Sequence, residues 1–299
     1  MFAIIGLFIV FGAVFGGFIG EGGPILILYQ PYEFLIIGGA AIGAMLAGTP
    51  PAVLKLITKE LPAVFAGSKY PRAAYDELLG AMFAIFTRAK REGFLTVEAD
   101  LANPQESEAF APYPALLANH HALEFLCDSM KLAISYQAKP EHIELAMDIY
   151  LETHHEEGGL GSASLTRVSD ALPGLGIVAA VLGIIIALQN LAAPPEVLGH
   201  SISAALVGTF LGLLLSYGMI QPIAANIEGQ AKESARYFQC IRESVGAYFN
   251  GCDPIVAVEI GRQAIYSYNR PTADQLDAIV SGRSGAPASA EGAAAPSGA

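Results

Sequence analysis

The polar candidates for ion transport in the longest apolar stretch of this sequence are hydroxyls. Ser203, Thr209, Ser216 and Tyr217 share this stretch, and a neutral hydroxyl cannot itself hold a proton at ordinary pH. An ionisable group inside a membrane costs at least about 2.5 to 3.5 kcal/mol, so such groups usually mark ion-transport sites. The sequence shows none at mid-depth. A carboxylate for proton movement would therefore have to come from another chain.

Two prolines and one acid lie near the ends of the apolar stretches. Asp170 precedes Pro173, and it is either a helix N-cap or an acid at the mouth of an ion path. Pro173 is expected in the first turn of a membrane helix, where proline costs little, whereas Pro222 lies deeper and should kink its helix and free a carbonyl. The two prolines are either packing features or a bending element that couples the membrane to the soluble region.

Other chemistry finds no support in the sequence. The run ETHHEE at 152–157 suggests a metal site, but adjacent histidines do not share a helix face, and a solvated helix end is favoured. No nucleophile elbow, phosphate-binding glycine loop, zinc-protease helix or kinase motif is present, so we expect no enzyme, cofactor or metal. A net charge of -12 and the lack of a basic, aromatic stripe argue against nucleic acid. Cys127, Cys240 and Cys252 lack metal-like spacing, and no disulfide is expected.

Four stretches are long enough to cross a bilayer, which takes about 20 apolar residues per helix. They are residues 2–20, 34–54, 171–195 and 197–227. All 16 Lys and Arg residues lie between positions 55 and 167 or between 232 and 283. Because cytoplasmic segments collect basic residues, this pattern predicts two membrane hairpins with both chain ends in the cytoplasm. The connections 21–33 and 194–199 carry acids but no bases and are expected to be external loops.

The soluble regions are predicted to be helical, because their apolar residues recur at intervals of three and four. A helix over 75–92 should stop at Gly93, the next should start after Thr96, and one over 140–155 should end before a break at glycines 158, 159 and 161. We therefore predict an all-α polytopic membrane protein with a helical cytoplasmic domain. The expected divisions are a first hairpin at 1–54, the cytoplasmic domain at 55–167, a second hairpin at 168–227, C-terminal helices at 228–280 and a disordered tail at 281–299.

Small residues repeat at intervals of four in each apolar stretch. Such residues let membrane helices approach closely. For any single pair, packing within the chain is favoured over a subunit interface, but a small-residue face on every helix also predicts oligomers. The repeats are Gly12, Gly16 and Gly20, then Gly39 and Gly43, Ala179 and Gly183, and Gly208 and Gly212.

Four segments together resemble one protein family. They are VFGGFIGEGGPILILYQPYEFLIIGGAAIGA near the N-terminus, NPQESEAFAPYP in the soluble region, DALPGLGIVAAVLG in the third apolar stretch and VGTFLGLLLSYGMIQPIA in the fourth. The chain resembles the MotA family, the larger membrane subunit of the bacterial flagellar stator, over essentially its whole length up to the tail.

This resemblance implies a partner and a task. Several copies of the chain would surround a dimer of a single-span MotB-type subunit in the bacterial inner membrane, and the partner's membrane aspartate would carry the ion. Ion flow, expected to be of H+, would turn the ring of MotA-like chains, and their cytoplasmic domains would push the rotor protein FliG. Electrical energy of about 2.3 kcal/mol per proton is available for each 100 mV of membrane potential.

The resemblance also assigns roles to residues. Pro173 and Pro222 match the family's functional prolines, and Thr209 matches the hydroxyl that faces the ion path. Ala180 stands where sodium-driven relatives place a second threonine, and alanine there favours protons. Asp170 is retained as a candidate at the mouth of the path.

For the rotor contact the family uses a basic residue and an acid, which Lys90 and Glu98 match, with Arg91 beside the first. A further acidic position of the family is Tyr150 here, which weakens a role for it. The charges of Lys90, Arg91 and Glu98 would also interact favourably with the helix dipoles if no partner were bound.

Two alternatives remain open. One is a protein like ExbB and TolQ, which energise envelope complexes with protons. Those proteins resemble a three-span plan, whereas this chain has an additional hairpin. A self-contained channel or transporter would need an intramembrane charge, which the sequence does not show.

Overall fold

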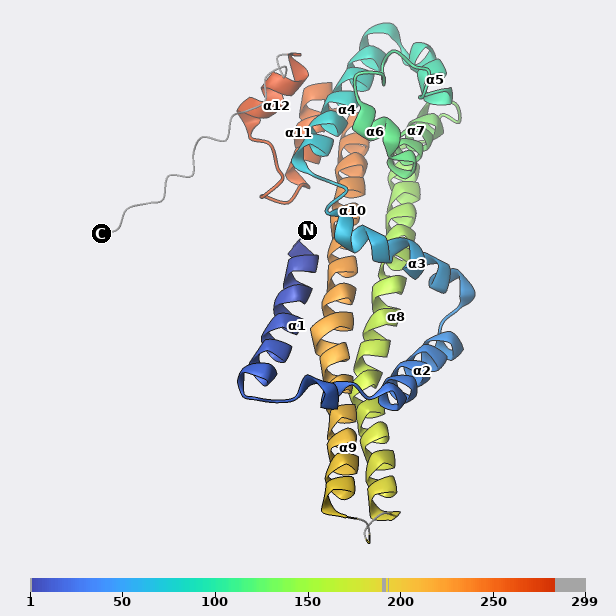
Figure 1. The fold of residues 1–299 in the computed structure, drawn as a ribbon. Coiled ribbons are helices and arrows are strands. Elements are labelled where there is room, and N and C mark those ends of the chain that lie inside the picture. The colour runs from blue at the N-terminus through green and yellow to red at the C-terminus, as the bar shows by residue number, and fades with distance from the viewer. Residues whose placement is uncertain (1, 190–191, 193, 283–299) are drawn as a thin grey trace, which may run out of the picture. The chain divides into compact units, whose positions relative to one another are not determined.

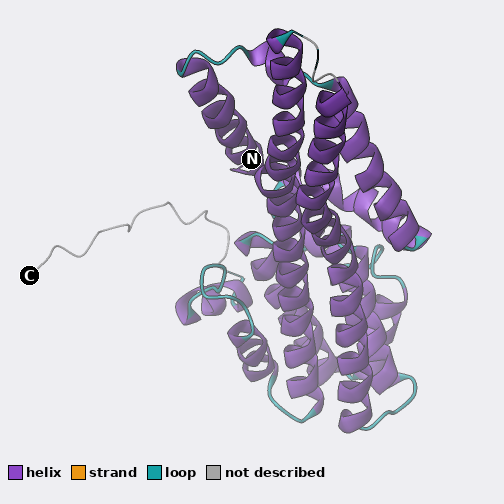
Figure 2. Ribbon diagram, turned by 90° about the horizontal axis from the view of Figure 1, so that it is seen from below, coloured by secondary structure: helices purple, strands orange, loops and turns teal. Residues whose placement is uncertain are grey.

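The structure, a computed structural model, describes residues 2–189, 192 and 194–282. These residues form helices joined by loops and turns, with no strand among them (Figures 1 and 2). The all-α prediction is confirmed, whereas the predicted disorder of the tail lies, from residue 283 onward, outside the described residues. In chain order the elements are α1 (Phe2–Gly20), η1 (Ile25–Leu28), α2 (Pro31–Gly48), α3 (Pro51–Ala66), α4 (Arg72–Glu92), α5 (Phe94–Ala102), α6 (Pro114–Ala118), α7 (His120–Ile134), α8 (Pro140–Gln189), α9 (Pro195–Leu215), η2 (Ser216–Ile220), α10 (Gln221–Phe249), α11 (Pro254–Gln263) and α12 (Ala273–Val280).

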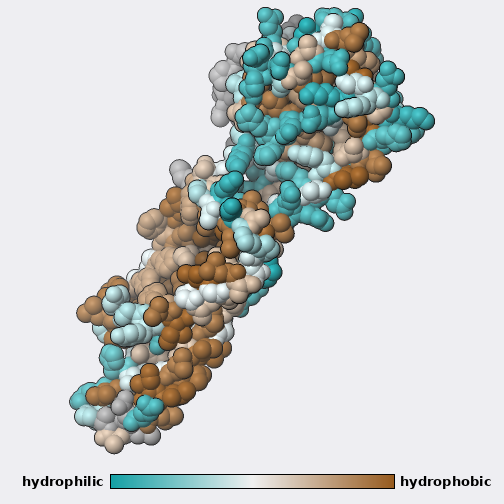
Figure 3. All heavy atoms as spheres, turned by 90° about the vertical axis from the view of Figure 1, so that its right-hand side faces the viewer, coloured by the Kyte–Doolittle hydropathy of each residue, from teal (hydrophilic) through white to brown (hydrophobic). Residues whose placement is uncertain are grey.

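The chain divides into two compact units. The first comprises Met1–Lys69 with Thr153–Lys232, and the second comprises Tyr70–Glu152 with Glu233–Ala299. Helix α3 thus belongs to the first unit as a whole, and the division expected between residues 54 and 55 falls inside this helix. The exposed surface of the first unit is mainly hydrophobic and that of the second mainly hydrophilic on the face drawn in Figure 3.

Four helical stretches in the described chain are long and apolar enough to cross a membrane, as predicted. They are Phe2–Gly20, Ile25–Gly48, Pro140–Gln189 and Pro195–Phe249. The last two are far longer than a bilayer requires, since about 20 residues suffice. The second ends earlier than predicted, because Pro50 and Pro51 terminate α2 after Gly48 and start α3.

Helices α8 and α9 form the closely packed centre of the first unit, and Figure 1 shows α1 and α2 beside them. A β-carbon built on Gly212 would lie 2.9 Å from Gly176 Cα, and one on Gly183 would lie 3.0 Å from Ala205 Cα. Glycine is needed at these positions because the two backbones nearly touch. The expectation of packing within the chain therefore holds for this helix pair.

The glycines of α1 behave differently. A β-carbon on Gly12, Gly16 or Gly20 would meet nothing within 4 Å in the described residues. Their small size serves no packing among the described residues, so this face of α1 is open there for another subunit or for lipid.

The predicted break before the second hairpin is wrong, because α8 runs without interruption from Pro140 to Gln189. Two of the three glycines are packing positions instead. A β-carbon on Gly161 would collide with the Glu60 side chain, and one on Gly158 would lie 3.3 Å from Ala231 Cβ. Their helical neighbours hold them in the helix despite a low intrinsic preference for it.

The second unit has its own hydrophobic core, with α4 buried along one face. Gly93 ends α4 with a φ of +88°, as expected. The next helix, α5, starts earlier than predicted, at Phe94, so Thr96 is not its cap; the Thr96 hydroxyl instead donates to the Gly93 carbonyl at 2.7 Å. Within this unit, Arg242 of α10 holds α8 through Asp148, with nitrogen to oxygen distances of 2.8 and 3.0 Å.

Candidate functional site

Pro173 lies inside α8 rather than in its first turn, which corrects the sequence interpretation. For the same reason Asp170 is not an N-cap: it stands in mid-helix, with an exposed side chain. Because proline has no amide hydrogen, the carbonyl of Ser169, four residues before it, lacks its usual helical donor.

A serine from the neighbouring helix supplies the missing donor. Ser216 Oγ donates to the Ser169 carbonyl at 2.7 Å, and Ser169 Oγ donates to the Ser216 carbonyl at 3.2 Å. Both side chains are fully buried. Sequence analysis noted Ser216 but missed Ser169, whose position four residues before a proline was the available signal.

Ser216 also begins the π-helical segment η2, which ends just before α10 and Pro222. The Gln221 amide donates to the Ser216 carbonyl across five residues instead of four. Such a π-turn, often found at functional sites, is consistent with the local disruption predicted for Pro222. The two prolines are therefore linked through the Ser169–Ser216 pair.

Ala180 and Thr209 lie at one level of the α8–α9 pair. A β-carbon on Gly208 would lie 3.4 Å from the Ala180 amide nitrogen, and one on Gly176 would lie 3.4 Å from Thr209 Cα. Both side chains are partly buried. The structure thus brings together the two positions that the resemblance assigned to the ion path.

Glu33 reaches the same level, and the sequence analysis missed it. The loop predicted to end at residue 33 ends earlier, because α2 begins at Pro31 and Glu33 lies in its first turn. Glu33 is only 7% exposed, and a β-carbon on Gly208 would lie 2.8 Å from its Oε2 atom. Glu33 therefore lies inside the candidate membrane span Ile25–Gly48, although the sequence placed it just before the predicted stretch 34–54. No group of three or more potential metal ligands occurs in the described chain.

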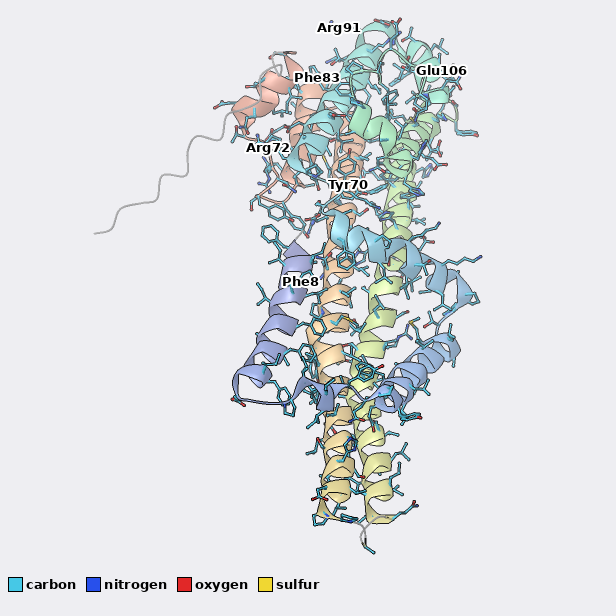
Figure 4. All side chains as sticks on the ribbon, in the orientation of Figure 1. Phe8, Tyr70, Arg72, Phe83, Arg91 and Glu106 are labelled. Atoms are coloured by element: carbon cyan, nitrogen blue, oxygen red, sulfur yellow. The ribbon has the colours of Figure 1, made fainter. Side chains whose placement is uncertain are left out.

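The predicted rotor residues lie in the second unit, where α4 turns into α5. Lys90 forms an ion pair with Asp253, and both side chains are more than half exposed. Glu98 accepts a hydrogen bond from Ser135 Oγ at 2.8 Å. Arg91, labelled in Figure 4, is exposed and has no ion pair within the described residues.

A cavity of about 380 Å³ adjoins this surface. It is lined by Lys90, Asp253 and Cys252 and floored by aromatic side chains that include Tyr248. Lys90 and Glu98 do not pair with each other. Tyr150 does not belong to this surface: its ring stacks on Phe125 at 4.4 Å between centroids, so it serves the core.

Two family models match the chain. Residues 4–93 match the model "Motility protein A N-terminal", and residues 118–239 match "MotA/TolQ/ExbB proton channel family". The chain is 40% identical over 277 residues to motility protein A of Salmonella typhimurium and, equally, to that of Escherichia coli, covering 93% of this chain and 94% of each relative.

The chain belongs to the motility protein A family. Its fold agrees, because the flagellar MotAB stator complex of Bacillus subtilis contains a similar chain with a TM-score of 0.73 and 26% identity. That match covers 90% of this chain and 98% of the other. As a motility protein A, the chain is a multi-pass membrane subunit of a flagellar stator with a proton-channel role.

Proposed function

We propose that this chain, with a MotB-type single-span partner, forms a proton-conducting stator unit that turns ion flow into torque. The observation that carries this proposal is the reciprocal Ser169–Ser216 pair, because it joins the helix that holds Pro173 to the π-segment before Pro222. Two helices linked at their irregular positions can pass a change at the ion path on to the soluble unit as bending. The role involves no covalent catalysis, cofactor or resident metal.

The ion-carrying carboxylate is assigned to the partner, around which several copies of this chain assemble. The open glycine face of α1 supports subunit packing. Proton flux into vesicles tests this assignment: the chain with its partner should conduct, and the chain alone should not. Flux through the chain alone would overturn it.

The transported ion is proposed to be H+, because alanine occupies position 180, at the level of Thr209 in the α8–α9 pair. A single hydroxyl supplies too few oxygen ligands for a dehydrated sodium ion, whereas a proton can pass between water molecules and carboxylates. Swimming should therefore stop with a protonophore and continue without sodium. Arrest on sodium removal would refute this choice.

For torque transfer, we propose that Lys90, Arg91 and Glu98 contact the rotor protein FliG. The Lys90–Asp253 pair is mostly exposed and is worth about 0 to 1 kcal/mol, so it can open when the rotor binds. Lys90→Glu combined with Glu98→Lys should reduce torque while membrane insertion and partner assembly stay normal. Lys131→Glu, on α7, is the control. Normal torque in the double variant would contradict the proposal.

The orientation follows the distribution of basic residues, all of which lie outside the four apolar stretches that the sequence defines. We propose that both ends of the chain and the second unit lie in the cytoplasm of a bacterial cell and that the helices cross its inner membrane. A phosphatase fused after the tail should be inactive if this is right, and an active one would reverse the orientation.

A further inference from the structure

A carboxylate without a partner is buried inside the apolar unit. Glu33, in the first turn of α2, is 7% exposed. Its Oε2 atom is inaccessible to solvent and has no hydrogen-bond partner in the described chain. Buried acids are normally paired or hydrogen-bonded, so this one needs an explanation.

Gly208 makes room for this carboxylate. A β-carbon at position 208 would lie 2.8 Å from Glu33 Oε2, closer than non-bonded atoms can approach. The same position faces α8, at 3.1 Å from Ala179 Cβ and 3.4 Å from the Ala180 nitrogen. Thr209 is the next residue of α9. The carboxylate therefore lies at the level of the two residues already assigned to the ion path.

This level is deep within the apolar helices. Gly208 comes 13 residues after Pro195, the first residue of α9. At 1.5 Å per residue, it lies about 20 Å along the helix, and the apolar core of a bilayer is about 30 Å thick. Glu33 thus contacts α9 far from the outer end of that helix.

No charge within the neighbouring helices offsets that of Glu33. Its apolar surroundings are the cluster that contains Ile37, Val207 and Leu211. The titratable groups of the packed helices that come nearest to this level in the sequence are Arg167 and Asp170 on α8 and Glu196 and His200 on α9. None of them forms an ion pair or hydrogen bond with Glu33 in the described residues, and Arg167 instead donates to Ala163 and Ser164 within α8. The two tyrosines of the η1–α2 connection are exposed.

An isolated carboxylate in such a site is costly as an ion, and a bound proton removes that charge. Glutamine has nearly the same shape and carries no charge. A glutamate at position 33 therefore packs no better than a glutamine would. The placement is explained if this side chain exchanges a proton.

We propose that Glu33 is a proton-binding residue of the ion path, which relays protons from the external side toward the partner's carboxylate. The carboxylate takes a proton from hydronium, leaving water, and releases it to the next water or carboxylate, so it is restored after each transfer. This inference rests on the proposed function and orientation.

The test compares Glu33→Gln and Glu33→Asp with the control Glu21→Gln, which removes an exposed acid near the end of α1. Each variant is expressed with the partner in cells that lack the native chain, and motor speed is recorded at low load over a range of external pH. Glu33→Gln should slow the motor at least about tenfold, as expected on losing a positioned proton-transfer group. It should also flatten the dependence of speed on pH, whereas Glu21→Gln should behave as the unmodified protein.

Glu33→Asp keeps the inference testable if the glutamine variant assembles poorly. Aspartate fits the site worse than glutamine but can still exchange a proton, so per assembled unit it should rotate faster than Glu33→Gln. A glutamine variant as fast as the unmodified protein, or faster than the aspartate variant, would overturn the inference. Either result would leave the proposed function standing, whereas failure of the unmodified chain to restore swimming would count against that function itself.

Discussion

Replacing Gly212 with alanine should separate the two central helices and break the serine pair between them. A β-carbon at position 212 would lie 2.7 Å from the Leu172 carbonyl oxygen and 2.9 Å from Gly176 Cα. Both contacts are with backbone atoms, which cannot rotate away as a side chain could. The helices themselves must therefore move.

The size of the movement follows from these distances. Ordinary contact begins at 3.4 Å, so the gap must widen locally by about 0.7 Å. Ser216 lies one helical turn beyond Gly212, and its hydrogen bond to the Ser169 carbonyl is 2.7 Å long. The same displacement would stretch this bond to the limit of a hydrogen bond.

The expected cost combines two effects. Overpacking of a close-packed site costs about 1 to 3 kcal/mol, and a hydrogen bond between membrane helices contributes about 0.6 to 1.7 kcal/mol. The gain in helix preference from glycine to alanine offsets about 1 kcal/mol. We therefore expect a net loss of about 0.6 to 3.7 kcal/mol.

Gly174 provides a matched control, because it lies in α8 and a β-carbon there would meet nothing within 4 Å in the described chain. Gly174→Ala shares the gain in helix preference but not the collision. Unfolding in detergent and swimming after complementation would be measured for both variants. Equal stability and swimming would refute the argument from backbone contact.

A double-mutant cycle with Ser216→Ala tests the link to the serine pair. If Gly212→Ala already breaks the bond, Ser216→Ala should cost much less in that background than alone. Strictly additive losses would show that the serine pair survives the insertion of a methyl group.

Three further predictions concern the second unit. Arg242→Ala should destabilise the second unit by about 1 to 3 kcal/mol, since the Arg242 side chain is 18% exposed and its loss leaves neighbouring carboxylates unpaired. Thermal unfolding would be compared with that of Arg91→Ala, and a smaller effect of Arg242→Ala would contradict the prediction. Near neutral pH, maleimide should label Cys252 in the folded chain but not Cys127, because burial raises the Cys127 pKa to about 12 and its thiolate is absent; mass spectrometry before and after denaturation checks the pattern. Asp253→Ala should leave torque intact and change stability by less than about 1 kcal/mol, because it only frees an exposed Lys90; a loss of torque would mean that the ion pair itself carries the load.

The parts of the fold that were predictable depend on composition over many residues. Four apolar stretches predicted the spans, and periodicity predicted α4 with its stop at Gly93. The parts that failed depend on a single distant neighbour. The ion pair between Lys90 and Asp253 joins residues 163 apart in the chain, and no local pattern encodes it.

Local rules treat glycine and proline as helix breakers, yet α8 passes through both. The Glu60 side chain lies against Gly161. The Ser216 hydroxyl donates a hydrogen bond to the Ser169 carbonyl, which Pro173 leaves without its helical donor. In a membrane an unsatisfied carbonyl is especially costly, so the neighbouring helix that satisfies it also fixes where the two helices meet. A position that weakens one helix alone thereby becomes a point of attachment between two.

The same reasoning explains why Glu33 was mistaken for a loop residue. In the sequence it is an acid that follows a turn containing Pro31, and such residues normally face water. Gly208, on another helix, leaves the space that the buried carboxylate fills. Apolar composition predicts which segments of a membrane protein lack charged residues. The burial of an acid depends instead on a residue of another helix, here a glycine, that leaves space for it.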